Sequence, residues 1–137
     1  MGFSFGAITA HAIAGRHYRA EGQRDFRAAI GLYGFCFRPK TPRNMLPLLL
    51  VHGDKDHRAL NDRKPGRAGP RPGCRAMKGK SKVEAHVLPD AYHAFDSPRH
   101  DEIREDRVGN KMLYSEKATE TAKGLIKKFL ARHLKAN

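Results

Sequence analysis

The order of apolar segments in this 137-residue chain predicts a single α/β domain with about three parallel strands flanked by helices. Two apolar runs, at residues 28–37 and 47–52, are nearly continuous, as is typical of parallel strands buried on both faces. A third run at residues 83–87 alternates apolar and polar side chains, which is typical of a strand nearer the edge of a sheet. Segments with helical spacing lie near both ends of the chain.

The first element begins with Gly2-Phe3-Ser4-Phe5-Gly6, which has the G-x-S-x-G pattern of a nucleophile elbow. In that turn small residues on both sides of the serine let a strand and a helix pass closely. Residues 5 to about 20 are predicted to form the helix. Only Met1 precedes the pattern, so we expect the strand that should feed the turn to be absent. The alternative for Ser4 is a small residue in a glycine-rich turn.

An acid and a histidine follow the later strands. The strand at residues 47–52 ends in a turn with Asp54 and Asp56, and the strand at residues 83–87 precedes a loop with His93. Open α/β sheets place their sites at these carboxyl ends. Ser4 as nucleophile, His93 as base and Asp56 as the group that orients the imidazole would form a catalytic triad. The alternatives are a solvated turn carboxylate at Asp56, with Asp54 competing for the role, and a structural hydrogen bond at His93.

The segment at residues 57–82 is a basic loop rich in proline and glycine. It holds nine Lys and Arg residues against one acid, a net charge of +8 out of the chain's +13. A short helical turn near residues 74–77 is compatible with its sequence. Such a segment attracts phosphates, but it has no aromatic residue for stacking on bases, so nucleic acid is not an expected partner. The alternative function is a catalytically inactive hydrolase fragment with non-specific polyanion binding through residues 57–82.

The C-terminal element is the clearest helix. Residues 98–110 are charged and irregular, and Ser115 is then a good N-cap. The helix that follows has an apolar stripe at helical spacing, made of Ala118, Ala122, Leu125, Ile126, Phe129, Leu130 and Leu134. A basic amphipathic helix can bind a membrane surface, but this stripe favours packing on a sheet.

Composition indicates a chain in a reducing, soluble compartment, which we expect to be the cytoplasm. Cys36 and Cys74 do not form a disulfide or C-x-x-C pattern, and there is no signal peptide or apolar run long enough for a bilayer.

The sequence His52-Gly53-Asp54-Lys55-Asp56-His57 resembles the H-x-H-x-D-H cluster of the metallo-β-lactamase superfamily. Asp54 stands where that cluster needs a second histidine, so we do not expect a metal site.

Three local sequences carry a family resemblance: Gly-Phe-Ser-Phe-Gly-Ala, Pro-Leu-Leu-Leu-Val-His-Gly-Asp-Lys-Asp and Tyr-His-Ala-Phe-Asp-Ser-Pro. With the closing Phe-Leu-Ala-Arg-His-Leu, they resemble the C-terminal half of the dienelactone hydrolase family, over about residues 2–56 and 74–134. The order Ser, Asp, His is that of the α/β-hydrolase fold. The resemblance implies a partial α/β-hydrolase fold whose N-terminal strands are missing. It also favours Asp56 over Asp54, since the family's acid stands three residues after the turn glycine.

The resemblance implies hydrolysis of a small-molecule carboxylic ester or lactone through an acyl-enzyme, with no cofactor. Dienelactone hydrolases proper use a cysteine nucleophile, so Ser4 points to an esterase-like member. The backbone N–H of Phe5 would be one donor of the oxyanion hole, and the other would come from the missing half. Because that second donor is missing, we expect marginal activity. With its neighbouring strands absent, the sheet would also have an open edge, from which we expect self-association.

Overall fold

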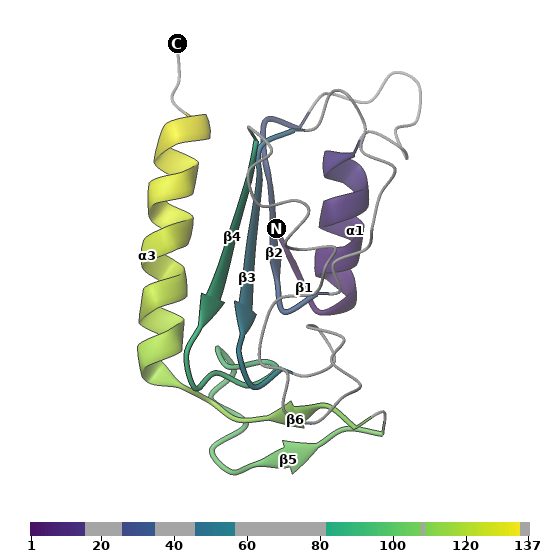
Figure 1. Ribbon diagram of the computed structural model, residues 1–137, viewed down its shortest axis with the longest axis vertical. Helices are drawn as coiled ribbons and strands as arrows, with labels where there is room; N and C mark the ends of the chain where they lie inside the picture. The colour runs from purple at the N-terminus through teal and green to yellow at the C-terminus, as the bar shows by residue number, and fades with distance from the viewer. Residues whose placement is uncertain (16–25, 35–45, 57–81, 108, 135–137) are drawn as a thin grey trace.

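The computed structural model describes residues 1–15, 26–34, 46–56, 82–107 and 109–134. Its centre is a four-stranded parallel sheet in the order β1-β2-β3-β4 (Figure 1). The strands are β1 (Gly2–Phe3), β2 (Ala29–Leu32), β3 (Leu48–Gly53) and β4 (Val83–Leu88). Helix α1 (Phe5–Ala14) lies on one face of the sheet, and helix α3 (Glu116–His133) lies on the other. The predicted α/β class, with parallel strands flanked by helices, is confirmed.

The continuous apolar run of β3 is explained by its position between the two helices. All six of its residues are buried. Because side chains alternate across a strand, Leu48 and Leu50 belong to the cluster on the α1 side with Ala10 and Ala14. The alternate residues of β3, Leu49 and Val51, join the second cluster with Phe129 and other residues of α3. Both faces of β3 are thus covered by apolar side chains.

Two strand predictions need correction at the N-terminal side. The turn at Ser4 does have a strand before it: Gly2 and Phe3 pair in parallel with Gly31 and Leu32 of β2. Hydrophobic pattern could not reveal this strand, because two residues are too few to show a periodicity. The strand predicted at residues 28–37 ends at Leu32. Tyr33 leaves the strand with a φ of 43°, a left-handed conformation that extended structure does not allow.

The charged segment predicted to be irregular contains a small antiparallel ribbon. Strand β5 (Arg104–Glu105) pairs with strand β6 (Lys111–Met112). The ribbon lies below the carboxyl ends of the main strands in Figure 1. It also supports the loop after β4, because the backbone N–H of His93 donates to the carbonyl of Lys111 at 3.1 Å.

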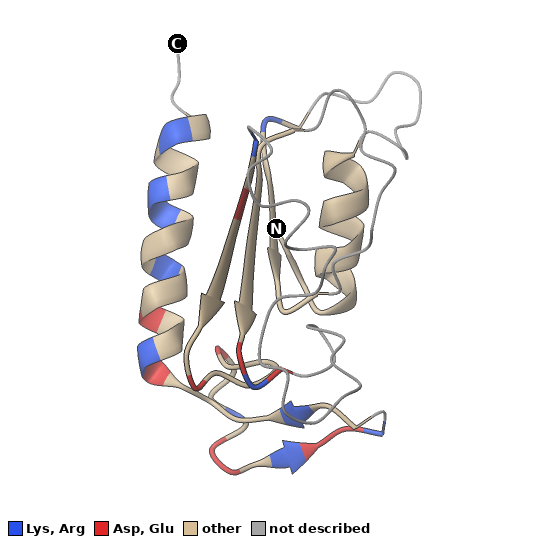
Figure 2. Cartoon of the chain, viewed as in Figure 1, with Lys and Arg blue, Asp and Glu red and all other residues tan. Residues whose placement is uncertain are grey.

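Helix α3 begins where the sequence predicts. Ser115 is its N-cap, and the side chain of Ser115 accepts a hydrogen bond from the N–H of Ala118. The apolar side of the helix packs on the sheet, with Ala122 and Phe129 buried. Its lysines, at 117, 123, 127 and 128, are exposed (Figure 2). Within the described part of the chain, α3 and the other helix are both too short or too polar to cross a bilayer.

Several predictions lie outside the described residues. These are the end of the first predicted helix beyond Gly15, the two cysteines, and the basic segment with its short helical turn, except for Lys82. The polyanion-binding alternative rests on that basic segment.

At two positions near the strands, another part of the backbone passes so close that only glycine fits. A Cβ atom at Gly2 would lie 2.0 Å from the carbonyl oxygen of Gly6, and one at Gly53 would lie 2.0 Å from the carbonyl oxygen of Ala91. Gly6 is different, because a Cβ there would meet nothing within 4 Å. The first glycine of the G-x-S-x-G pattern is therefore required by packing, whereas the second is not.

We expect Gly53→Ala to destabilise the fold by roughly 1–3 kcal/mol, the cost of overpacking a tight contact. The new methyl group would meet the backbone of Ala91, which cannot move aside as a flexible side chain can. Urea unfolding followed by circular dichroism measures the change.

The matched control is Gly124→Ala in α3, where the new methyl group meets nothing within 4 Å. We expect this variant to stabilise the fold by about 0.5–1 kcal/mol, because alanine restricts the unfolded chain and favours the helix. If the two substitutions change stability in the same direction, the close contact at Gly53 is not the cause.

Candidate active site

Ser4 occupies the sharp turn between β1 and α1. Its φ of 50° and ψ of −115° are strained for a residue with a Cβ. The backbone is held by its neighbours: the Ser4 N–H donates to the carbonyl of Leu32 at 3.0 Å, and the Ser4 carbonyl accepts from Ala7 at 3.0 Å. The hydroxyl of Ser4 makes no capping hydrogen bond to α1. A serine serving only as a turn or cap residue would use its hydroxyl on the helix backbone, and this one does not.

The hydroxyl of Ser4 instead meets His93, which lies 89 positions along the chain. Ser4 Oγ and His93 Nε2 are 3.0 Å apart. The other ring nitrogen of His93, Nδ1, lies 2.7 Å from Oδ2 of Asp56. An ionised carboxylate can only accept, so Nδ1 carries the proton and donates to Asp56. Nε2 is then an acceptor, and the Ser4 hydroxyl donates to it.

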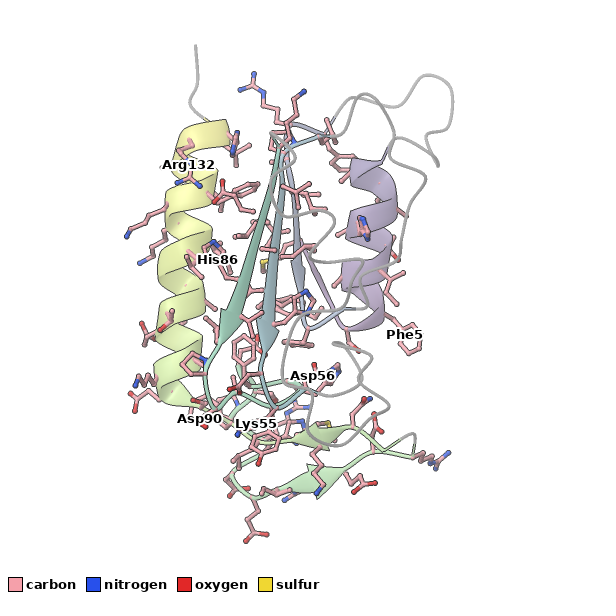
Figure 3. All side chains as sticks on the ribbon, viewed as in Figure 1. Phe5, Lys55, Asp56, His86, Asp90 and Arg132 are labelled. Carbon is pink, nitrogen blue, oxygen red and sulfur yellow. The ribbon has the colours of Figure 1, made fainter. Side chains whose placement is uncertain are left out.

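Asp56 is the acid that contacts the histidine, and Asp54 is not. Asp56 lies just after β3, close to the end of the strand, and is 2% exposed (Figure 3). Its backbone N–H donates to the carbonyl of Gly53 at 3.2 Å. One carboxylate oxygen of Asp54, Oδ1, is buried without a hydrogen-bond partner among the described residues. Of the two carboxylates in this turn, the one hydrogen-bonded to His93 is therefore that of Asp56.

The loops that carry Asp56 and His93 are joined to each other. The N–H of Asp54 donates to the carbonyl of Leu88 at 2.9 Å, and the N–H of Lys55 donates to the carbonyl of Ala91 at 3.0 Å. The ammonium of Lys55 also lies 3.7 Å from the carboxylate of Asp90, an exposed pair that adds little to stability. Backbone hydrogen bonds between neighbouring loops therefore hold Asp56 and His93 close together.

Two buried histidines lie near this group. Burial lowers the pKa of His52 to about 4, against the opposing effect of the negative charge of Asp56. Burial also lowers the pKa of His11, on α1. Both imidazoles are therefore neutral at pH 7. These two rings therefore add no positive charge near His93 and Asp56 at that pH.

Tyr33 lies against the site, a position that no sequence pattern indicates. Its ring is in edge-to-face contact with the imidazole of His93, with centroids 4.8 Å apart. Its hydroxyl donates to Oδ1 of Asp96 at 2.8 Å. Desolvation by burial, and then this hydrogen bond, raise the pKa of Tyr33 above its usual range. The sequence predicts that Tyr33 lies in the middle of the strand at residues 28–37, and this prediction does not place it beside His93.

Phe5, the predicted oxyanion-hole residue, is the first residue of α1. The first N–H groups of a helix have no intrahelical acceptor, and they carry the positive end of the helix dipole. The side chain of Phe5 is 78% exposed and points away from the sheet (Figure 3). The backbone N–H of Phe5 therefore lies at the positive end of the helix and has no acceptor within it, an arrangement that favours anion binding.

The described residues contain no group of three or more His, Cys, Asp or Glu side chains able to hold a metal ion. His57, the last member of the metal-like sequence pattern, lies outside the described residues. Asp56, another member, is hydrogen-bonded to His93.

Neither a scan against models of known protein families nor a search of curated proteins finds a match to this chain. The candidate site therefore rests on the geometry of its own residues.

We expect the fold to lose stability as the pH falls from about 6.5 towards 4. In the unfolded chain His52 has its ordinary pKa of 6.5, whereas burial lowers the folded value to about 4. The unfolded state therefore binds the proton more tightly across this window, and acid favours unfolding. The loss from His52 is about 3 kcal/mol when the window has been crossed. Urea unfolding at a series of pH values between 7.5 and 4 measures it.

The control compares two glutamine substitutions. His52→Gln removes the buried titrating group and should flatten the pH dependence in this window, whereas His86→Gln on β4 should leave it close to that of the wild type. Equal pH dependence in the wild type and His52→Gln would assign the acid sensitivity to other groups.

Proposed function

We propose that this chain is a serine hydrolase that cleaves a carboxylic ester or lactone through an acyl-enzyme. The observation that carries the proposal is the hydrogen-bond series from Ser4 Oγ to His93 Nε2, at 3.0 Å, and from His93 Nδ1 to Asp56 Oδ2, at 2.7 Å. Nucleophile, base and orienting acid are the three parts that acyl transfer by serine requires. The strained backbone of Ser4 is a second support, because such strain is found at functional turns.

The fold and the order of the residues favour an α/β-hydrolase of the dienelactone hydrolase type. Ser4 follows β1, Asp56 follows β3 and His93 follows β4, so the three residues come in the order Ser, Asp, His at the carboxyl ends of parallel strands. In this proposal the chain corresponds to the C-terminal half of that fold, and serine replaces the cysteine of dienelactone hydrolases proper.

The first half of the reaction follows from the geometry. Ser4 Oγ attacks the carbonyl carbon while His93 Nε2 takes the hydroxyl proton, and Asp56 stabilises the imidazolium that forms. The carbonyl oxygen becomes an oxyanion beside the N-terminus of α1, where the N–H of Phe5 can donate to it. The bond to the alcohol oxygen then breaks as Nε2 returns the proton to that oxygen. The products are an alcohol and an ester of Ser4.

The second half repeats these steps with water. His93 Nε2 takes a proton from a water molecule, whose oxygen attacks the acyl carbon of the Ser4 ester. The bond to Ser4 Oγ breaks, and the proton on Nε2 returns to that oxygen. The carboxylic acid is released and the serine hydroxyl is restored. The scheme uses only the side chains named above, backbone donors and water.

Self-association is a further part of the proposal, supported by the edge of the sheet. Strand β1 has only two residues, and in the described part of the chain it pairs on one side only, with β2. Large apolar side chains are exposed beside it: Met1 is 68% exposed and Phe3 is 43% exposed. An open strand edge with exposed apolar residues is a template for pairing with another chain.

We expect a fluorophosphonate probe to label the wild-type protein on Ser4 alone. Ser4→Ala should abolish labelling, and His93→Ala should reduce it to the level of that variant, because the hydroxyl then has no base. Asp56→Asn should lower the labelling rate by up to about 10⁴-fold, since the imidazole would adopt the wrong tautomer. Mass spectrometry of the labelled peptide and the rate of p-nitrophenyl acetate hydrolysis are the measurements.

Two other histidines serve as matched controls. His100→Ala and His133→Ala leave His93, the histidine that is hydrogen-bonded to Ser4 and Asp56, in place, so labelling should remain close to that of the wild type. Labelling that survives Ser4→Ala, or that falls equally in all three histidine variants, would contradict the proposed roles.

We expect the purified chain to sediment as an oligomer whose size increases with protein concentration. Phe3→Arg should shift it towards the monomer, because a charge beside the β1 edge opposes close pairing. Ile103→Arg is the control, since Ile103 is a 57% exposed apolar residue near β5 rather than β1. A monodisperse wild-type monomer at all concentrations would refute association through this edge.

A further inference from the structure

Tyr33 is fixed at the end of β2 by the neighbouring strand. It is a non-glycine residue with a φ of 43°, in the left-handed region, and it is 6% exposed. Its backbone N–H donates to the carbonyl of Val51 in β3 at 2.8 Å. The strand β3 leads directly to Asp56, so the same strand that places the acid also fixes the backbone of Tyr33.

The side chain of Tyr33 is held at both ends. Its hydroxyl donates to Oδ1 of Asp96, three residues after His93. Its ring packs edge-to-face on Phe95, with centroids 5.6 Å apart and planes at 79°, and lies 6.1 Å from the ring of Phe3. Phe95 is fully buried. The tyrosine ring therefore has little freedom to move.

The same ring contacts His93. The centroids of the two rings are 4.8 Å apart and the planes meet at 65°, an edge-to-face arrangement. The imidazole has to keep Nδ1 towards Asp56 and Nε2 towards Ser4 at the same time. A rotation of the imidazole would break both hydrogen bonds and would disturb its contact with the tyrosine ring.

We propose that Tyr33 is a positioning residue that holds the imidazole of His93 in the orientation and tautomer that the Ser4–His93–Asp56 series requires. This inference rests on the proposed hydrolase function for its catalytic meaning, but the orientation of His93 can be measured by itself. Tyr33 acts through ring packing, and the hydrogen bond to Asp96 keeps the ring in place. The ring also shields one side of His93 from water, which preserves the strength of the hydrogen bond to Asp56.

The role of the ring can be separated from that of the hydroxyl. Tyr33→Phe keeps the ring and removes the hydrogen bond to Asp96, whereas Tyr33→Leu removes the ring that contacts His93. Phe129→Leu is the matched control: it removes a fully buried ring from the same core cluster, but one that packs on His133 instead of His93. Tyr33→Met replaces Tyr33→Leu if the leucine variant does not fold by circular dichroism.

The first readout is long-range ¹H–¹⁵N spectroscopy of the histidine rings, with His93 assigned by a His93→Gln variant. In the wild type, Tyr33→Phe and Phe129→Leu, we expect one tautomer with the proton on Nδ1. In Tyr33→Leu we expect a mixture of tautomers. A single unchanged tautomer in Tyr33→Leu, or a mixture already present in the wild type, would overturn the positioning role whether or not the protein is a hydrolase.

The second readout is the rate at which a fluorophosphonate labels Ser4. Tyr33→Leu should lower this rate by roughly 10–100-fold, the effect of displacing a catalytic group by about 1 Å. Tyr33→Phe should recover most of the wild-type rate, and Phe129→Leu should not show the loss. If the wild type is not labelled, the hydrolase function fails while the tautomer measurement still decides the role of Tyr33. If the wild type is labelled and Tyr33→Leu keeps the same rate, the positioning role fails alone.

Discussion

The position of β3 at the centre of the sheet is the constraint on which the rest of the structure depends. It pairs with β2 over four residues and with β4 over six, and apolar side chains cover both of its faces. Its carbonyl at Val51 holds Tyr33. The turn after it carries Asp56, and N–H groups of that turn donate hydrogen bonds to carbonyls at the end of β4 and in the loop that follows. The acid, the tyrosine and the histidine loop are all positioned relative to one strand that is buried on both faces.

The candidate site combines strain with burial, and both are supported by neighbouring structure. Ser4, Tyr33 and Ala94 all have positive φ angles, and each lies in or next to the group of Ser4, His93 and Asp56. Conformations of this kind cost about 1–3 kcal/mol each when strained, and they persist only where the surroundings hold them. Here the surroundings are backbone hydrogen bonds, such as that from Ser4 to Leu32, and aromatic packing around Tyr33. The strained backbone conformations are therefore stabilised by the sheet and not by the site residues alone.

Elements with a strong hydrophobic signal could be predicted from the sequence, and strands of two residues could not. The strands at residues 47–52 and 83–87 and the helix after Ser115 were located to within one residue, because burial on one or two faces fixes their patterns. Strands β1, β5 and β6 have two residues each, too few for any periodicity. The left-handed turn at Tyr33 leaves no trace in hydrophobicity, so the strand was predicted too long and the contact with His93 was missed. The meeting of Ser4, Asp56 and His93 could be foreseen, because the carboxyl ends of parallel strands converge at one edge of the sheet.

Because β1 is short, the candidate site would open locally before the rest of the sheet unfolds. Ser4 follows a strand paired to the sheet through only two residues, while Asp56 and His93 follow strands of six residues. Regions with few backbone hydrogen bonds open at lower free energy than the global transition. Fraying of β1 would separate the serine from the imidazole while β2, β3 and β4 stay paired. The nucleophile would then be the least protected part of an otherwise folded domain, and backbone amides near Ser4 would exchange with solvent well before those of β3.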